Sequence, residues 1–439
     1  MPAKSRGRNR SGPQGEVGVE RQGASKLVVG TAAFLGMVVS SPAVLSVNPL
    51  LLKPTIAEFG WSRGTISSAY LIAAPIMAVL YMVVGPALDR FGARRLLLVG
   101  YILFGASTAL LSLMDGSIAQ LLLLKVIVTS CATLPTGVAF GKVISSHFSA
   151  RRGTMLGFCL GGGGGLGMML MPLIGAAVLE QAGWRLTYVV VGAIAAAVGL
   201  IATSLLPPDA PRAGTMAAPA DVGGESGSVA WRTPTFLIML AATLISCMVL
   251  NGTIQHLAAI MTDVGMSTHE AALTLSIYAL SMICGQFGVG LLADRIASPR
   301  IMLPILFLAM TGIFLLYGVH SKLTGMAGAA CVGASAGSEY GLLPYMITRY
   351  FGLRSFGRLY GLIYAAAAFG TGFGPYVMGA TYDLTGSYDR ALLAFGAGLV
   401  VVVVLMARLP GYIFAANGDR LEQPGRPETG NAGGVVPTA

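Results

Sequence analysis

The stretch GPALDRFGARR, residues 85–95, occurs a second time as GLLADRIASPR at residues 290–300. Both copies follow a long apolar run, and both keep a glycine, an Asp-Arg pair and a final arginine at similar places. Two further matches lie at nearly the same spacing: GWS at 60–62 with GMS at 265–267, and RRGTMLG ending at Gly157 with SFGRLYG ending at Gly361. Three matches at offsets of 204 or 205 residues indicate two repeats in the same orientation.

Long apolar runs flank these loops throughout the chain. Of its 439 residues, 55% are hydrophobic and only 10% are charged, and the mean hydropathy is +0.75. Soluble proteins of ordinary composition are far more polar. A run of roughly 20 apolar residues crosses a hydrocarbon core about 30 Å thick. Twelve runs, numbered here as spans one to twelve, predict an all-α membrane protein: residues 27–51, 64–84, 96–114, 118–141, 153–178, 186–206, 235–257, 269–290, 301–319, 324–347, 357–381 and 389–409.

Segment 207–233 is the only long interior stretch that is rich in Pro, Gly, Ala and Ser and has no apolar run. Such a composition is typical of a linker. We therefore divide the chain into an N-terminal tail (1–26), a six-helix bundle (27–206), the linker (207–233), a second six-helix bundle (234–410) and a C-terminal tail (411–439). In transporters with parallel repeats, substrate binds between the halves near the bilayer midplane, and the halves rock around it.

The net charge of +10 is compatible with binding to nucleic acid or with contact to an anionic membrane surface. The positions of the charges along the chain distinguish the two. With the N-terminus placed inside, 22 Lys and Arg residues fall on the inner side and 5 on the outer side. This bias is typical of membrane proteins with cytoplasmic termini. We expect a multi-pass protein of the inner (cytoplasmic) membrane and no nucleic-acid partner. The outer residues are Lys53, Arg63, Arg185, Lys322 and Arg390, and Lys125 lies within span four.

The G-x-x-x-D-R-x-G-x-R-R loop after span two, with its copy after span eight, resembles the signature loop of the major facilitator superfamily. The resemblance extends over all twelve spans and implies two pseudo-symmetric six-helix bundles and alternating access. EFGWSRGTIS after span one, HFSARRGTMLG entering span five and GWR before span six are similar to the monocarboxylate-transporter and oxalate-formate-exchanger branch. This second resemblance implies a small organic anion, moved with protons or by exchange.

The family resemblance also implies a latch between the halves at the cytoplasmic end. Its residues are Gly85, Asp89, Arg90 and Gly92, followed by Arg94. A carboxylate at this edge can pair with arginines or with a helix N-terminus of the other half in one rocking state and lose these contacts in the other. The alternative for the arginines is that they are solvated anchors that follow the charge bias. Asp294 and Arg295 form the weaker second copy, because Ala297 stands where the first copy has Gly92.

Ionisable groups within spans are the best functional candidates, because each costs about 2.5 to 3.5 kcal/mol on insertion scales. Lys125 lies about eight residues into span four, or roughly 12 Å from its outer end by helix rise. With Thr129, Thr133 and Thr136 it predicts a polar stripe along one helix. Lys125 is either a lysine that extends to the outer interface or a cation for an anionic substrate.

Glu339 lies about fifteen residues into span ten, too deep for its short side chain to reach the interface. Desolvation penalises the charged carboxylate there, which is the property that a proton carrier needs. The alternative is a protonated carboxyl that only hydrogen-bonds a neighbouring helix. Span ten corresponds to span four in the other repeat, so Lys125 and Glu339 can face one central cavity.

Further polar residues lie on spans of the kind that line such a cavity, although most polar residues at such positions serve helix packing. The candidate substrate contacts are Asn48, Asn251, Tyr278, Gln286, Tyr340 and Tyr345. His256 lies near the outer end of span seven, where water can solvate it, and is a second candidate for proton coupling.

The resemblance to the monocarboxylate branch implies an arginine in span eight that binds the substrate carboxylate. Span eight has no basic residue, and Gln286 stands at about that place. A neutral amide cannot replace a bidentate charge-assisted pair. Either Lys125 supplies the positive charge from the other half, or the substrate is not a simple carboxylate. The alternatives are a proton-coupled exporter of a drug-like or other non-carboxylate solute, and a nutrient sensor on the same fold.

The run LGGGGGLG at 160–167 matches the dinucleotide pattern G-x-G-x-x-G but lies inside span five, where a strand and a soluble βαβ unit are missing. Gly153, Gly157, Gly161 and Gly165 recur every four residues, which is typical of close helix packing in membranes. The resemblance places span five against span eight of the other half. We interpret Gly157, Gly161 and Gly165 as a sliding surface between the halves, with a static packing seam as the alternative.

No motif in the sequence points to catalysis or to a bound cofactor. HExxH, G-x-S-x-G and P-loop patterns are missing, and the five cysteines fall within spans without paired spacing. We expect no enzyme activity, no metal and no cofactor. The expected partners are a small-molecule substrate, protons and the lipid bilayer, with the monomer as the functional unit.

Overall fold

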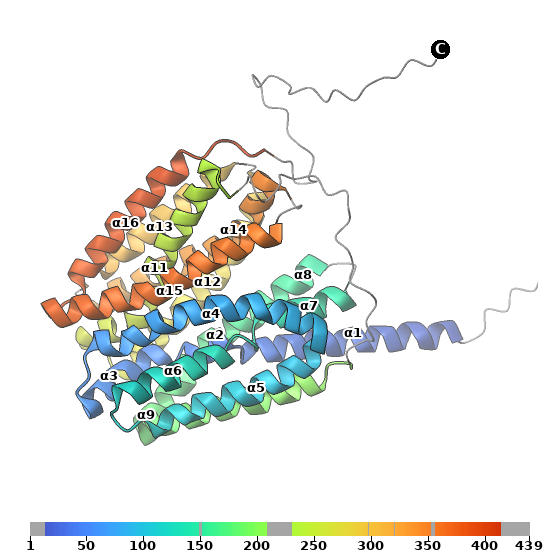
Figure 1. The fold of residues 1–439 in the computed structure, drawn as a ribbon, viewed down its shortest axis with the longest axis horizontal. Coiled ribbons are helices and arrows are strands. Elements are labelled where there is room, and N and C mark those ends of the chain that lie inside the picture. The colour runs from blue at the N-terminus through green and yellow to red at the C-terminus, as the bar shows by residue number, and fades with distance from the viewer. Residues whose placement is uncertain are drawn as a thin grey trace, which may run out of the picture.

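The structure is a computed structural model that describes residues 14–148, 152–208, 231–296, 298–319, 321–352 and 356–413. These residues form helices joined by short turns (Figure 1). Most of the predicted linker and much of both predicted tails lie outside the described residues. Within the described chain, eight helical stretches are long and apolar enough to cross a membrane, and helices lie over each of the twelve predicted spans.

The N-terminal half contains the helices of predicted spans one to six. Its elements are α1 (Gln14–Val38), α2 (Ser41–Leu45), α3 (Asn48–Phe59), α4 (Arg63–Phe91), α5 (Ala93–Leu110), α6 (Ile118–Cys131), α7 (Gly137–His147), α8 (Arg152–Leu156), a π-helical segment (Gly157–Gly163) and α9 (Gly164–Ser204). Helix α9 covers part of span five and nearly all of span six, and it breaks at Gly183, whose φ of +77° favours glycine.

The C-terminal half contains the helices of predicted spans seven to twelve. They are α11 (Pro234–Asp263), α12 (Thr268–Arg295), α13 (Met302–Leu316), α14 (Lys322–Phe351), α15 (Phe356–Thr385) and α16 (Asp389–Ala407). Helices α12 and α14 pack with their backbones in contact: a Cβ atom on Gly337 would lie 1.8 Å from the carbonyl oxygen of Met282. Small residues permit this approach, as in other membrane helix pairs.

The prediction of one continuous helix over span four is wrong. Helix α6 ends at Cys131, and α7 begins only at Gly137. Pro135 lies between them, and its missing N–H group and ring prevent an uninterrupted helix. Thr133 and Thr136 therefore belong to the break, and the predicted polar stripe does not extend beyond α6.

The halves meet mainly along two helix pairs, α4 with α15 and α9 with α12, and α3 also packs against α11. At one end α4 and α15 are in backbone contact, because a Cβ atom on Gly379 would lie 2.7 Å from the carbonyl oxygen of Arg63. At the other end, Gly85 and Gly361 have no atom within 4 Å of such a Cβ, and Figure 1 shows the two helices diverging. Following the predicted orientation, we call the Arg63 end the outer end and the Gly85 end the inner end.

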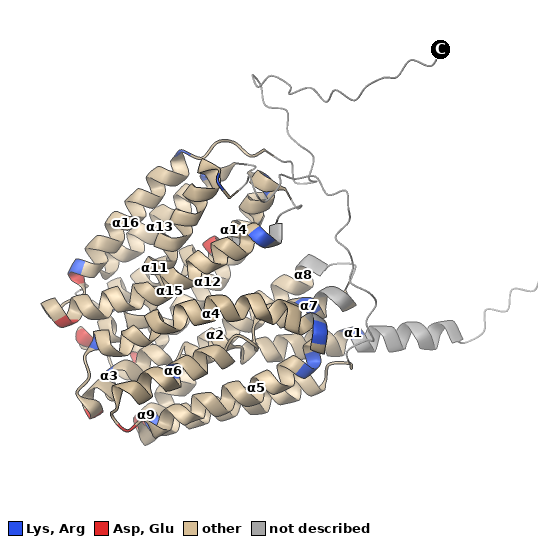
Figure 2. Cartoon of the chain, in the orientation of Figure 1, with Lys and Arg blue, Asp and Glu red and all other residues tan. Residues whose placement is uncertain are grey.

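The charged side chains that the structure describes gather at the ends of the helices. Figure 2 shows Lys and Arg at the inner end, a mixture of both signs at the outer end, and mostly uncharged residues between them. The long uncharged middle suits a hydrocarbon environment, in which isolated charges are costly. The few buried charges are therefore the groups that need an explanation.

Candidate functional site

A small pocket lies between the two halves toward the outer end. The N-terminal half contributes residues from α3, α4, α6 and α9, and α11 of the C-terminal half contributes two. Its polar lining consists of Asn48, Thr55, Ser67, Tyr70, Lys125, Tyr188, Gln255 and His256. The free volume is about 20 Å³, which is room for one or two water molecules. A substrate can enter only when the halves move apart.

Lys125 is the central cation of this pocket and is 7% exposed. Its ammonium lies 3.4 Å from Asn48 Oδ1 and 3.4 Å from the Tyr188 hydroxyl. The rings of Tyr188 and Tyr70 lie 5.5 and 6.0 Å from it. Within the described residues no carboxylate pairs with Lys125. The lysine points into the pocket rather than out to the membrane surface, with neutral partners only.

Most of the other predicted substrate contacts lie elsewhere. Asn48 lines the pocket. The Asn251 amide donates to the carbonyl of Cys247 in its own helix, and the Tyr345 hydroxyl donates to the carbonyl of Ala293. Gln286 faces Gly161 across the seam between the halves. The side chain of Tyr340 lies outside the described residues.

Glu339 does not line the Lys125 pocket. It is 7% exposed and lies inside the C-terminal half near Ser246 and Cys247 of α11 and Tyr278 of α12. Among the described residues no Lys or Arg forms an ion pair with it. The two deep ionisable groups therefore occupy separate environments.

His256 is buried, not solvated as its position near the end of span seven suggested: it is 1% exposed. Its Nε2 lies 3.1 Å from Ser67 Oγ of the N-terminal half and 3.0 Å from the carbonyl oxygen of Pro375. Its Nδ1 lies 2.9 Å from the hydroxyl of Tyr388. Helices of both halves cover the outer end of α11, so His256 does not face bulk water and lines the Lys125 pocket instead.

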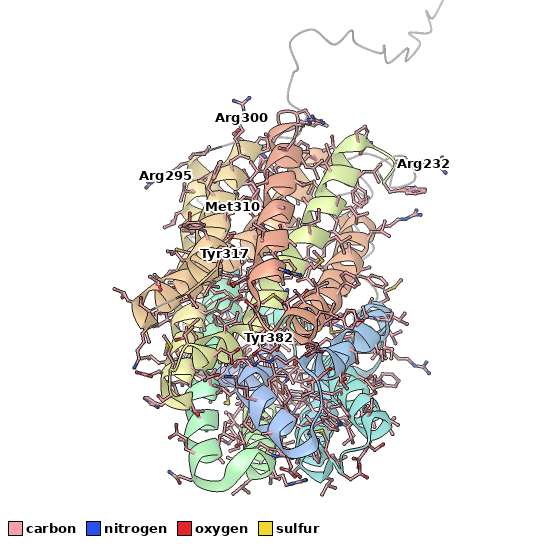
Figure 3. All side chains as sticks on the ribbon, turned by 90° about the vertical axis from the view of Figure 1, so that its left-hand side faces the viewer. Arg232, Arg295, Arg300, Met310, Tyr317 and Tyr382 are labelled. Atoms are coloured by element: carbon pink, nitrogen blue, oxygen red, sulfur yellow. The ribbon has the colours of Figure 1, made fainter. Side chains whose placement is uncertain are left out.

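Arg63 is a functional candidate that sequence reasoning missed. Its guanidinium forms a bidentate pair with Asp263, at 2.8 and 3.2 Å, and also donates to the Tyr388 hydroxyl. The ring of Tyr382 lies 3.5 Å from the guanidinium carbon, and Figure 3 shows Tyr382 where the two halves meet. The only sequence signal is the position of Arg63 beside the helix cap Ser62, with acids at the outer ends of two distant spans.

A second contact of the same kind involves the backbone of α4. Asp383 accepts hydrogen bonds from the backbone N–H groups of Arg63 and Gly64, at 3.0 and 2.7 Å. A carboxylate at a helix N-terminus satisfies free N–H groups and interacts favourably with the helix dipole. The other half thus caps α4. We call Arg63, Asp263, Asp383 and Tyr388 the outer clamp.

The predicted cytoplasmic latch is described only in part. The side chains of Asp89 and Asp294 lie outside the described residues. Gly92 ends α4 with a φ of +85°, and Arg94 donates to the carbonyl of Ser204 at 3.2 Å. Arg90 and Arg295 are exposed, and Gly85 has open space around it. The latch role of these residues stays a prediction.

The glycine run adopts π-helical geometry over Gly157–Gly163, and this segment packs beside α12 of the other half. A Cβ atom on Gly165 would lie 2.2 Å from Ile283, one on Gly161 3.4 Å from the Gln286 amide oxygen, and one on Gly157 3.7 Å from Phe287. Such π-helical turns inside helices are often found at functional sites. The glycines let the two halves approach closely at this seam.

Comparison with known proteins places this geometry in a family. The chain is 25% identical over 337 residues to YhjX of Escherichia coli, described as an uncharacterized MFS-type transporter, with 73% of this chain and 78% of that protein covered. It is 27% identical over 339 residues to monocarboxylate transporter 13 of Bos taurus, covering 75% and 76%. The solved structure of the nucleoside transporter NupG matches with a TM-score of 0.70 at 15% identity, covering 88% of this chain and 100% of that one.

The model of the Major Facilitator Superfamily matches residues 29–260 and 235–432, which together span nearly all described helices. The two relatives named above are transporters, and the family is one of transporters rather than enzymes. The chain belongs to the Major Facilitator Superfamily and is a multi-pass membrane transporter.

Proposed function

We propose that the protein moves a small organic anion of the monocarboxylate type, coupled to protons or by exchange, and that Lys125 binds the anionic group. The observation that carries this proposal is a buried ammonium between the halves with neutral partners only. Removing a charge from water costs several kcal/mol, which an opposite charge in the same pocket can offset. An anion is therefore the ligand whose charge suits this pocket.

The contacts around Lys125 leave its binding capacity free. An ammonium has three donors, whereas its two partners here, Asn48 and Tyr188, lie at 3.4 Å, beyond the usual range for a strong hydrogen bond. A carboxylate oxygen can come closer and form a charge-assisted bond, which is about twice as strong as a neutral one. Asn48 and Tyr188 then position the substrate beside the lysine.

The relationship to monocarboxylate transporter 13 supports this substrate class. Gln286 is the main departure from the span-eight arginine that the resemblance to the monocarboxylate branch implies. Gln286 lies at the seam with Gly161 and not in the Lys125 pocket. The positive charge for the substrate would then come from α6 of the N-terminal half rather than from α12. Such a change in position favours a substrate that differs in shape from those of relatives with a basic residue in span eight.

Proton coupling is the finer part of the proposal and involves Glu339 and His256. Both side chains are buried, and Glu339 has no ion-pair partner among the described residues. A carboxyl group in such surroundings can take up and release a proton as the halves move. Because Glu339 does not line the Lys125 pocket, substrate and proton would be coupled through motion of the halves.

The test begins with a thermal-shift screen of purified protein against organic acids, amino acids and cationic drugs. Uptake of the stabilising compound and its affinity are then measured in liposomes that contain the Lys125→Ala or the Lys125→Gln variant. Lys322→Ala is the matched control, because that lysine is exposed at the outer end and pairs with Glu270. We expect both Lys125 variants to lose at least about ten-fold in affinity for the anion, the equivalent of about 1.4 kcal/mol, and the control to retain it.

Three results would contradict the proposal. Unchanged anion affinity in Lys125→Gln would place the anion site elsewhere. Stabilisation by cationic drugs alone would favour an exporter, and binding without any uptake or exchange would favour a sensor.

A further inference from the structure

The outer clamp joins the halves and is connected to the Lys125 pocket by hydrogen bonds through His256. Arg63 belongs to the N-terminal half, and its partners Asp263, Asp383 and Tyr388 belong to the C-terminal half. His256 contacts the same Tyr388 hydroxyl and also lines the pocket. One chain of hydrogen bonds therefore connects the substrate pocket with the contacts that close the outer end.

The protonation state of His256 decides which groups donate and which accept in this chain of hydrogen bonds. The carbonyl of Pro375 can only accept, so its contact with Nε2 requires a hydrogen on Nε2, and Ser67 Oγ, 3.1 Å away, is then a second acceptor for that hydrogen. In the neutral ring, Nδ1 is then an acceptor for the Tyr388 hydroxyl, and that hydroxyl in turn accepts from Arg63. A second proton on Nδ1 would turn the acceptor into a donor. Two cationic donors would then point at one hydroxyl, whose own hydrogen would lose its acceptor.

The charges around His256 show what a proton there does to the attraction between the halves. The N-terminal half contributes three cations, and the C-terminal half contributes two carboxylates. They are Lys53, Arg63 and Lys125 on one side and Asp263 and Asp383 on the other, with the neutral phenols Tyr70, Tyr188, Tyr382 and Tyr388 among them. Protonation of His256 would reduce the net charge of the C-terminal side from −2 to −1. The attraction across the seam therefore weakens.

We infer that Arg63 holds the outer end closed and that proton binding to His256 releases this clamp, so that His256 couples protonation to outer opening. The inference rests on the proton coupling proposed above and assigns it a residue and a mechanism. Arg63 acts as a positioning residue, because it contacts the opposite half rather than the substrate. Neutral His256 accepts a hydrogen bond from Tyr388 and so supports the outer clamp. Protonated His256 and Arg63 are both cations, and they repel each other because both contact the Tyr388 hydroxyl.

The test measures the separation of the halves directly and needs no substrate. Spin labels are attached at Ala119→Cys and Leu323→Cys, which are exposed near the outer starts of α6 and α14, in a background without native cysteines. A second pair at Leu205→Cys and Arg300→Cys reports on the inner end. Distances are recorded by pulsed electron paramagnetic resonance in lipid nanodiscs at about pH 8 and about pH 5, on either side of the usual range for histidine.

In the parent protein, acidification is expected to raise the ratio of molecules with the longer outer distance to those with the shorter one. The expected rise is at least about five-fold, the lower end of typical allosteric coupling. His256→Gln keeps a donor for Pro375 and an acceptor for Tyr388 but cannot take the proton, so its distances should not change with pH. Arg63→Gln should show the longer outer distances at both pH values. His269→Gln is the matched control, because His269 lies exposed near the outer end, and it should respond like the parent.

A full pH response in His256→Gln, or a closed outer end at both pH values in Arg63→Gln, would overturn the inference. If Arg63→Gln does not fold, Arg63→Lys keeps the charge but loses the bidentate geometry and should open the outer end to an intermediate degree. These measurements can reject the role of His256 and Arg63 without rejecting the proposed substrate class. The thermal-shift and affinity tests of Lys125 do not depend on pH-driven opening.

Discussion

Gly379→Ala is expected to open the outer end of the transporter by adding a single methyl group. The added Cβ atom would lie 2.7 Å from the carbonyl oxygen of Arg63 and 2.9 Å from the backbone nitrogen of Gly64. Both neighbours are backbone atoms at the start of α4 and cannot rotate away. To reach 3.4 Å, where ordinary contact begins, α15 must move about 0.7 Å away from α4 at this point.

The magnitude follows from the cost of overpacking, typically about 1–3 kcal/mol. The strain exists only while α4 and α15 are packed together at the outer end, and it disappears when the halves separate there. The whole cost therefore acts on the equilibrium between the two states. A difference of this size corresponds to a shift of about 5- to 150-fold in favour of the outer-open state.

The assay is the outer distance distribution between labels at Ala119→Cys and Leu323→Cys at neutral pH. Gly361→Ala is the matched control, because it lies in the same helix with open space around the added Cβ, and it should leave the distribution unchanged. If Gly379→Ala kept the parent distribution while its thermal stability fell, the strain would be absorbed within one half and the reasoning would be refuted.

Two further outcomes are expected from the buried acid and from the glycine seam. Glu339→Gln should abolish proton-driven accumulation in liposomes while counterflow exchange continues, and full accumulation at an imposed pH gradient would contradict its role as a proton carrier. Gly165→Leu, whose side chain would meet Ile283 of α12, should reduce the rate of transport by a larger factor than it reduces substrate affinity. Equal losses of rate and affinity would instead indicate a static seam.

Much of the architecture was predictable because hydropathy and repeats are properties of neighbouring residues. Each apolar run has to form its backbone hydrogen bonds within itself in a membrane, so a long run predicts a helix without knowledge of its neighbours. The same argument identified Lys125 and Glu339, since an ionisable group in an apolar run is costly wherever the helix packs. The loop at 85–95 and its copy were sufficient for the family, which the comparisons confirm.

Local breaks in the helices were only partly predictable. Pro135 gives a reason for the end of α6. Span four nevertheless has the hydropathy of one long apolar run, despite Lys125 and its threonines, and was predicted as one helix. The π-helical turn at Gly157–Gly163 has no separate signal within the glycine run. Hydropathy reports the environment of a segment and is insensitive to how its backbone hydrogen bonds shift by one residue.

Sequence alone determined that the chain is a two-repeat membrane transporter with a cation and an acid deep in its spans. The tertiary structure decided which of these groups meet: it separates Glu339 from the Lys125 pocket, buries His256 and brings Arg63 to Asp263, 200 residues away, and to Asp383, 320 residues away. In the sequence Arg63 is indistinguishable from the other Lys and Arg residues on the outer side, because it lies at the edge of a span. Its burial depends on which helix of the other half packs against α4, and that contact is a property of the assembled halves.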